Sequence, residues 1–356
     1  MSYFTLPTGY KHSLNSRPRG RLSSTPIPHS CNVPYRTVVV DYNSNCLICG
    51  CDGWLPIPVG QVQDFATLDE VWNSPVAKIL QQDIDSKKFT WCAVDHCGIK
   101  QRDINQTRYE LSINIDESCN LHCPSCRRDP IMHLSGPVVD KKIQDIERVL
   151  LWLESFEHPI HIVLSGNGDP LASAIIRPLI KKYKPKTNQT FKLFTNGLLI
   201  KKQLADTNIL NNITEFSISI DAGSQEVYEN VRRGGSWSVL LENFDYLKSI
   251  NKNRLTILNF AVQKNNFNDL QNFVDLCQHY GFNANIHGLD NWGTWNTDEV
   301  LEPDTWTIKN GTFQQHDVLN KHHNQHSECK QIIQTLMLAA HRHVNFSFDL
   351  KAKIKQ

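Results

Sequence analysis

The sequence has no strong charge of one sign and no long apolar run. Its 356 residues carry 37 Lys and Arg against 36 Asp and Glu, a formal net charge of +1, so no single-sign field marks a nucleic-acid or membrane surface. No apolar stretch approaches the roughly 18 residues of a membrane span. Residues 1–30 lack the apolar core of a secretory signal, and we expect a flexible arm there. These absences predict a cytoplasmic protein without membrane or nucleic-acid partners.

Cysteine is unusually frequent in the sequence. The chain has 11 cysteines, and many of them stand in short clusters. Without a signal peptide, such clusters favour metal sites in a reducing compartment over disulfides. With 40% hydrophobic and 21% charged residues, the chain can form one large domain and a small one.

The densest cluster places Cys119, Cys123 and Cys126 at the spacing C-x3-C-x2-C. Thiolates at this density suit an iron–sulfur cluster or zinc. A structural zinc site needs four protein ligands, and no fourth cysteine or well-spaced histidine stands beside the three. Three thiolates can hold a [4Fe–4S] cluster whose fourth iron is open, although a zinc knuckle stays an alternative.

This loop resembles the cluster loop of the radical S-adenosylmethionine (SAM) superfamily. The resemblance implies that Cys119, Cys123 and Cys126 hold a catalytic [4Fe–4S] cluster and that SAM binds its open iron. It also implies a flavodoxin-like or ferredoxin-like one-electron donor. Reductive cleavage of SAM would then give a 5′-deoxyadenosyl radical, which removes a hydrogen atom from a substrate.

The order of strands and helices predicts the fold class. Residues 105–116 form a strand that leads into the cysteine loop, and apolar residues at helical spacing follow at 143–153. Strand and helix patterns then alternate, which indicates an α/β fold with a parallel sheet and helices outside it. The resemblance implies an open, TIM-like (β/α)6 partial barrel. The later strands are expected at 161–165, 191–195, 215–220, 255–262 and 283–287.

The remaining motifs follow strand ends, where ligands bind in such folds. The resemblance implies that Asp169 binds the SAM amino group, that Asp221 contacts the ribose and that Arg232, or else Arg233, pairs with the SAM carboxylate. A Gly-rich turn, a helix cap by Asp221 and arginines on a solvated helix end are the plainer alternatives. The full set of expected SAM-binding residues is Ser165, Gly166, Asn167, Gly168, Asp169, Thr195, Asn196, Ser219, Asp221, Arg232 and Val262.

A second group of cysteines precedes the barrel. The sequence predicts a hairpin formed by a β-branched run at 36–41, a polar turn and Cys46-Leu47-Ile48-Cys49. One amphipathic helix is expected to follow over 68–80. The stretch resembles the twitch module, a half-size SPASM domain that holds an auxiliary cluster. The resemblance implies a second [4Fe–4S] cluster, while a zinc site built from the same residues stays open. The expected ligands are Cys31, Cys49, Cys92 and Cys97, with Cys51 as the alternate to Cys49.

These patterns divide the chain into four parts and lead to one main hypothesis. The parts are the arm at 1–30, the auxiliary module at 31–104, the radical SAM partial barrel at 105–289 and a C-terminal extension at 290–356. The hypothesis is a radical SAM enzyme that modifies a peptide or another small substrate by oxidation, cross-linking or maturation. The alternatives are a SAM-dependent methyl or methylthio transferase and a non-catalytic metal-cluster scaffold.

Overall fold

The fold is seen in a computed structural model that contains two compact units. The first unit comprises Met1–Ser118, His133–Lys192 and Asp206–Ile213, and the second comprises Cys119–Met132, Leu193–Ala205 and Thr214–Gln356. The structure describes residues 27–50, 55, 57–92, 94, 99, 102–127, 129–263 and 265–288, and the backbone of β1 (Tyr3–Thr5), β2 (Lys11–Ser13), β12 (Trp306–Lys309), β13 (Thr312–Gln315) and β14 (Phe346–Phe348).

A sheet of mixed direction forms the core of the first unit. Parallel pairing joins β3 (Thr37–Val40) to β6 (Tyr109–Ile113), and β6 to β7 (Ile160–Leu164). On the other side β3 pairs antiparallel with β4 (Asn45–Leu47), which confirms the predicted hairpin, and β4 pairs with the short β5 (Gly60–Gln61). The N-terminal hairpin therefore continues the same sheet as the strand that leads into the cysteine loop.

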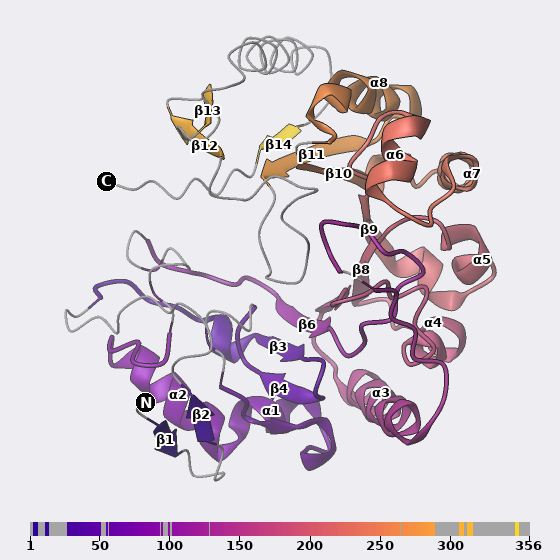
Figure 1. The fold of residues 1–356 in the computed structure, drawn as a ribbon. Coiled ribbons are helices and arrows are strands. Elements are labelled where there is room, and N and C mark those ends of the chain that lie inside the picture. Colours follow the sequence, from indigo (N-terminus) through magenta and orange to yellow (C-terminus); the bar gives the residue numbers. More distant parts are fainter. Residues whose placement is uncertain are drawn as a thin grey trace. The chain divides into compact units, whose positions relative to one another are not determined.

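Two helices lie beside this hairpin, α1 (Leu68–Asn73) and α2 (Pro75–Asp85) (Figure 1). The single helix predicted over this stretch is wrong, because Ser74 has the extended ψ of 153° that a following proline favours. Ser74 then caps α2, since its hydroxyl accepts a hydrogen bond from the backbone N–H of Ala77. Short 3-10 turns at Val33–Tyr35 and Val62–Asp64 complete this part.

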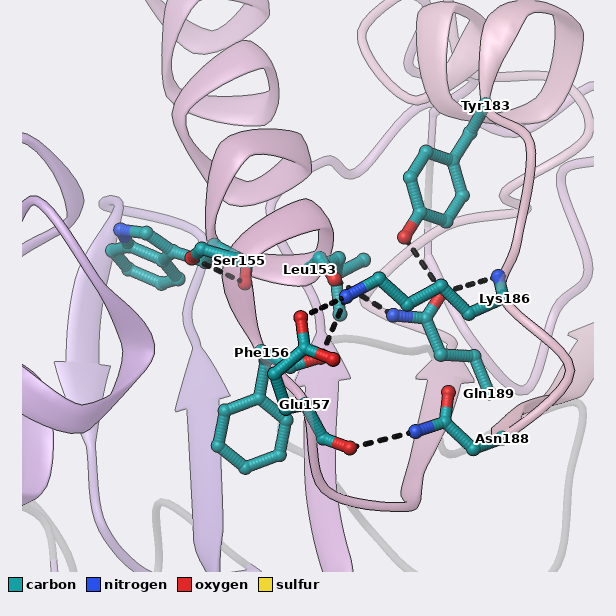
Figure 2. A network of polar contacts seen from close by, with 9 residues as sticks. Leu153, Ser155, Phe156, Glu157, Tyr183, Lys186, Asn188 and Gln189 are labelled. Carbon is teal, nitrogen blue, oxygen red and sulfur yellow. Dashed lines mark hydrogen bonds and ion pairs between the residues drawn. The ribbon is translucent and has the colours of Figure 1, made fainter.

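The helix expected after the cysteine loop is α3 (Pro137–Ser155), and α4 (Arg177–Lys182) follows β7. Figure 2 shows how the end of α3 is tied to the start of β8 (Gln189–Thr195). Lys186 Nζ donates to the Phe156 carbonyl at 3.2 Å, and Gln189 Nε2 donates to the Leu153 carbonyl at 2.7 Å. These bonds satisfy carbonyls at a helix end, which otherwise lack partners.

The second unit alternates parallel strands with helices. Parallel pairing joins β9 (Ile213–Ser219), β10 (Thr256–Val262), β11 (Asn283–Gly288) and β14 in that order. The helices between these strands are α6 (Gln225–Val231), α7 (Trp237–Ser249) and α8 (Leu270–Tyr280), while α5 (Ile200–Leu204) follows β8. Helix α8 lies along β10 and β11 (Figure 1), and Phe273 of α8 contacts Phe260 of β10 edge-to-face, at 5.0 Å between ring centroids.

The predicted α/β fold with a parallel sheet is confirmed, with the strand–helix alternation that the partial-barrel hypothesis requires. The predicted division into four parts stays a prediction. Most of the arm at 1–30 and of the extension at 290–356 lies outside the described residues.

Trp152 of α3 offers a direct test of the first unit's core. Its side chain is fully buried, and Nε1 donates to the Phe65 carbonyl at 3.1 Å. Replacing Trp152 by Ala opens a cavity and leaves that carbonyl unpaired, so we expect a loss of about 3–5 kcal/mol in the free energy of unfolding, measured by urea titration. The adjacent Leu151 is 52% exposed, and Leu151→Ala is expected to stay within about 0.5 kcal/mol of wild type. Equal losses in the two variants would contradict this packing.

Candidate functional site

The cysteine loop leaves β6 through a buried aspartate. The Oδ1 atom of Asp116 accepts the backbone N–H groups of Glu117 and Ser118 at 2.8 and 3.2 Å, and Oδ2 accepts the hydroxyl of Ser173 at 2.6 Å. A carboxylate that accepts several such bonds fixes the local backbone strongly. Asp116 therefore determines the direction in which the chain enters the loop.

Lys142 of α3 also binds the chain just after β6. Its ammonium donates to the Ile115 carbonyl at 2.9 Å and lies 3.4 Å from the centroid of the Tyr42 ring. Burial lowers the pKa of Lys142, and the negative charges of Asp116 and Glu117 oppose that shift. The hairpin turn of the N-terminal part and the start of the loop are thus joined through one buried cation.

The Gly-rich motif after β7 packs on the backbone that precedes the first cysteine. A Cβ on Gly168 would overlap the Ser118 carbonyl, so only glycine allows this approach. The N–H of Asp169 donates to the same Ser118 carbonyl at 2.8 Å, and Asp169 Oδ1 accepts the N–H of Leu171 at 2.9 Å. Within the first unit, the structure therefore brings the predicted SAM motif against the base of the cysteine loop.

Asn114 is a residue of this site that sequence reasoning missed. Its Oδ1 accepts the hydroxyl of Ser165, the first residue of the predicted SAM motif, at 2.7 Å. It also accepts the hydroxyl of Ser112 at 3.2 Å. Polar residues alternate along this strand end, at 112, 114 and 116, and that spacing was the available signal.

The cysteines themselves stand on a closed loop in the second unit. The N–H of Cys119 donates to the Ile131 carbonyl at 2.9 Å, and the N–H of Cys126 donates to the Cys123 carbonyl at 3.0 Å. Cys119 is half-buried, Cys123 buried and Cys126 exposed. The backbone N–H of Leu121 donates to Cys119 Sγ at 3.4 Å, a type of contact that stabilises cluster-bound sulfur.

Two further donors from strand and helix ends reach these sulfurs. Asn196 Nδ2 donates to Asn120 Oδ1 at 2.9 Å and lies 3.9 Å from Cys119 Sγ. Arg232 Nη1 lies 3.8 Å from Cys123 Sγ. Burial raises the pKa of the Cys123 thiol, and the positive charge of Arg232 acts in the opposite direction. A donor and a cation beside sulfur favour the thiolate, which is the form that binds metal.

Arg232 is paired with Asp221, another predicted SAM-binding residue. Its Nη2 lies 2.6 Å from Asp221 Oδ2, and the two side chains are 15% and 4% exposed. Burial lowers the pKa of Arg232, but the charges of Asp221 and Cys123 outweigh that effect, and the pKa lies above its ordinary value. Among the described residues, Arg232 Nε is buried without a hydrogen-bond partner.

The backbone around Asp221 is held by residues that the sequence analysis did not single out. Asp221 has a φ of 54°, in the left-handed region, and its Oδ1 accepts the N–H of Ala261 at 2.8 Å. Asn266 Nδ2 donates to the carbonyls of Asp221 and Ala261, both at 2.9 Å, and Asn266 Oδ1 accepts the N–H of Gln263 at 2.6 Å. The motif Gln263-x-x-Asn266 therefore positions Asp221.

The other predicted residues stand at strand ends as expected. The hydroxyl of Thr195 accepts the N–H of Gly197 at 3.2 Å. Val262 is 7% exposed at the end of β10, and Ser219 is half-buried at the end of β9. Gly166 and Asn167 are exposed in the turn after β7. These positions leave the predicted SAM contacts as proposals.

The donor chemistry of the loop fits an iron–sulfur cluster, although its sulfurs do not form a preformed metal site. Across the described ranges, no group of three or more Cys, His, Asp or Glu side chains is arranged so that it could hold a metal ion. The fit rests instead on three thiols in one closed loop with hydrogen-bond donors aimed at two of them. In the N-terminal part Cys31, Cys49 and Cys92 are half-buried, while Cys51 and Cys97 lie outside the described residues.

Comparison with known proteins finds a family match over less than half of the chain. Residues 113–277 match the family model of the radical SAM superfamily. The chain carries a radical SAM domain. The matched range includes the three cysteines of the loop and all the predicted SAM-binding residues, and the family implies a [4Fe–4S] cluster and SAM as cofactors.

The relatives share about half of their length with this chain. It is 27% identical over 180 residues to the GTP 3',8-cyclase of Alkaliphilus metalliredigens, covering 49% of this chain and 53% of the relative. It is 26% identical over 184 residues to the mycofactocin maturase MftC of Mycobacterium ulcerans, covering 50% and 47%. A solved structure, native anSMEcpe with bound AdoMet and Cp18Cys peptide, is similar at 18% identity and a TM-score of 0.37, covering 51% of each chain.

In the part of the chain that the structure describes, no helix is both long and apolar enough to span a bilayer.

The ion pair between Asp221 and Arg232 can be tested by removing one charge. Asp221→Asn keeps the side chain's shape but leaves a buried guanidinium without its counter-ion, and we expect a loss of about 3–5 kcal/mol in the free energy of unfolding. The double variant Asp221→Asn/Arg232→Met contains no unpaired buried charge and should lose less than the single variant. Urea unfolding of the metal-free protein measures both. A double variant that is less stable than the single one would refute the pairing as the cause.

Proposed function

We propose that this chain is a radical SAM enzyme that cleaves SAM reductively and removes a hydrogen atom from a substrate. The observation that carries the proposal is the closed loop with Cys119, Cys123 and Cys126, which follows the end of a parallel strand inside the matched radical SAM domain. Because the match covers about half of the relatives' length, the reaction of the whole protein belongs to the proposal.

In this proposal the chain's own residues prepare a site for two cofactors. Cys119, Cys123 and Cys126 would hold the [4Fe–4S] cluster, and the donors from Asn196 and Arg232 would favour their thiolate forms. When bound, the cluster and SAM supply the electron-transfer and radical chemistry that protein side chains cannot.

The predicted SAM contacts differ in how strongly the geometry supports them. The stretch from Ser165 to Asp169 exposes backbone near the loop base, which supports its role toward the SAM amino group. Asp221 already accepts bonds from Ala261 and Arg232. A ribose contact must therefore share this carboxylate, and its main part in the proposal is to orient Arg232 toward the SAM carboxylate.

A peptide is the leading substrate class. One relative bears the name mycofactocin maturase, and auxiliary-cluster modules of the kind that the N-terminal cysteines resemble accompany peptide modification. The proposal includes a second [4Fe–4S] cluster on Cys31, Cys49, Cys92 and Cys97, with Cys51 as the alternate to Cys49. It also includes a flavodoxin-like or ferredoxin-like electron donor and a cytoplasmic location.

The reaction is tested by product analysis after anaerobic reconstitution. With dithionite and SAM, we expect the wild-type protein to form 5′-deoxyadenosine and the Cys119→Ala, Cys123→Ala and Cys126→Ala variants to form none, because each removes a proposed cluster ligand. Cys277 is buried in α8, outside both cysteine groups, so Cys277→Ala is the matched control and should retain the activity.

Liquid chromatography of the quenched reactions decides the reaction class. S-adenosylhomocysteine as the main product would overturn the proposal in favour of methyl or methylthio transfer. Absence of both products in wild type and control would instead favour the non-catalytic scaffold.

The second cluster is tested by counting iron and sulfide per chain. A cubane cluster holds about four irons, so wild type should contain about eight and the triple variant of Cys119, Cys123 and Cys126 to Ala about four. If the triple variant binds no iron, the N-terminal cysteines hold zinc or no metal, and only the one-cluster enzyme remains.

A further inference from the structure

A row of hydrogen-bonded polar side chains crosses the parallel strands of the second unit. Asn285 Nδ2 of β11 donates to Asn259 Oδ1 of β10 at 2.8 Å, and Asn259 Nδ2 donates to Ser217 Oγ of β9 at 2.9 Å. Asn259 and Asn285 are direct partners in the strand register. We call Ser217, Asn259 and Asn285 the polar row.

The polar row occupies the face of the sheet that α8 does not cover. Phe260, the neighbour of Asn259, packs on Phe273 of α8, and successive strand residues point to opposite faces. The neighbours of Ser217, Phe216 and Ile218, are fully buried. The sheet is thus apolar toward its helix layer, and the polar row lies on the opposite face.

Polar residues at these positions call for an explanation other than packing. Parallel strands buried on both faces are normally rich in Val, Ile and Leu, and such side chains also fill the interior of α/β barrels. Ser217 and Asn259 are only 3% and 8% exposed, so each side chain gave up hydration when it was buried. Functional sites are places where proteins trade stability for activity, and a buried polar row in a sheet fits such a trade.

The same strands lead from the polar row to the proposed SAM site. Asn259 stands three residues before Val262, and Ser217 four before Asp221. At about 3.3 Å per residue, the polar row lies roughly 10–13 Å along the strands from those positions. Two residues of the polar row therefore lie on the two strands that lead to Asp221 and Val262, within three to four residues of each.

The chemistry of the polar row selects a neutral hydrogen-bonding partner. The side-chain amide of Asn259 has two N–H donors and two acceptor lone pairs, of which the polar row uses one each. It can therefore also pair with the N–H and the C=O of one extended residue of a peptide, which flank the same Cα atom. A triphosphate would call for Lys or Arg, and the polar row contains neither.

We propose that the polar row is the substrate subsite of this chain and that it binds a backbone amide of a peptide. The inference rests on the proposed function, because it assigns the substrate class of the same site.

The test measures binding separately from catalysis. The reconstituted 356-residue chain, with SAM present, is dialysed against a synthetic pool of random, N-acetylated and C-amidated decapeptides, and the retained peptides are counted by mass spectrometry. We expect wild type to retain a subset of the pool, and Asn259→Leu and Asn285→Leu to retain at least about tenfold less, the typical effect of losing one paired amide in a buried site. GTP, dialysed in parallel, should not be retained.

Asn283→Leu is the matched control, because Asn283 lies on the same strand and face but bonds to the Arg254 carbonyl, outside the polar row. It should retain peptides as wild type does. Asn259→Leu leaves the Ser217 hydroxyl and the Asn285 amide without this partner, so we expect a lower urea midpoint whatever the role of the polar row. The SAM retained in the same dialysis distinguishes a binding role from a structural one. A subsite predicts that the variant retains SAM as wild type does, whereas a structural network predicts that SAM and peptides are lost together.

Each remaining result decides the proposal. Retention of GTP in place of peptides, equal retention of peptides by wild type and Asn259→Leu, loss of SAM together with peptides in Asn259→Leu, or no retention of peptides by wild type would overturn it. If peptides bind through Asn259 while no 5′-deoxyadenosine forms in separate assays, the proposed reaction fails and the peptide subsite stands.

Discussion

The buried ion pair between Asp221 and Arg232 is the interaction on which the cysteine loop's environment depends. Asp221 follows the end of β9 and Arg232 follows the end of α6, and Arg232 Nη1 also lies 3.8 Å from Cys123 Sγ. The next residue, Arg233, accepts the N–H of His122 through its carbonyl at 3.1 Å. A strand end, a helix end and the loop are thus joined at one point. Breaking a buried pair of this kind costs several kcal/mol, so the three segments are fixed together.

The backbone conformation of Asp221, one partner of the pair, costs free energy. Asp221 has a left-handed backbone, which for a residue other than glycine costs on the order of 1–3 kcal/mol. The cost is offset by Asn266, which binds the Asp221 carbonyl, and by Ala261, whose N–H binds the Asp221 side chain. Strained backbone that its surroundings hold in place is typical of functional sites.

Local patterns predicted the elements well but not the partners of polar side chains. The cysteine spacing, the strand before it and the alternation after it all follow from short-range periodicity, and the hairpin at β3 and β4 was found in the same way. Asp221 and Arg232 were each assigned to a ligand, whereas the structure pairs them with each other, because the pairing depends on rotamers and on the end of β10. The join of β3 to β6 spans about 70 residues, and no local pattern encodes a parallel pairing at that distance. At Ser74, apolar periodicity predicts one continuous helix, whereas the following Pro75 favours an extended residue that separates α1 from α2.

The ion pair and a ligand role for Arg232 are compatible because of how the guanidinium is used. Nη2 of Arg232 pairs with Asp221 Oδ2, and Nη1 lies near Cys123 Sγ. Among the described residues, Nε has no acceptor although it is buried, and an unmet buried donor costs about 1–3 kcal/mol. A carboxylate brought to Nε would remove that cost. Asp221 would meanwhile keep the guanidinium plane fixed, so that the ligand finds its donor already oriented. The pairing that sequence reasoning missed therefore supports the role that it proposed for Arg232.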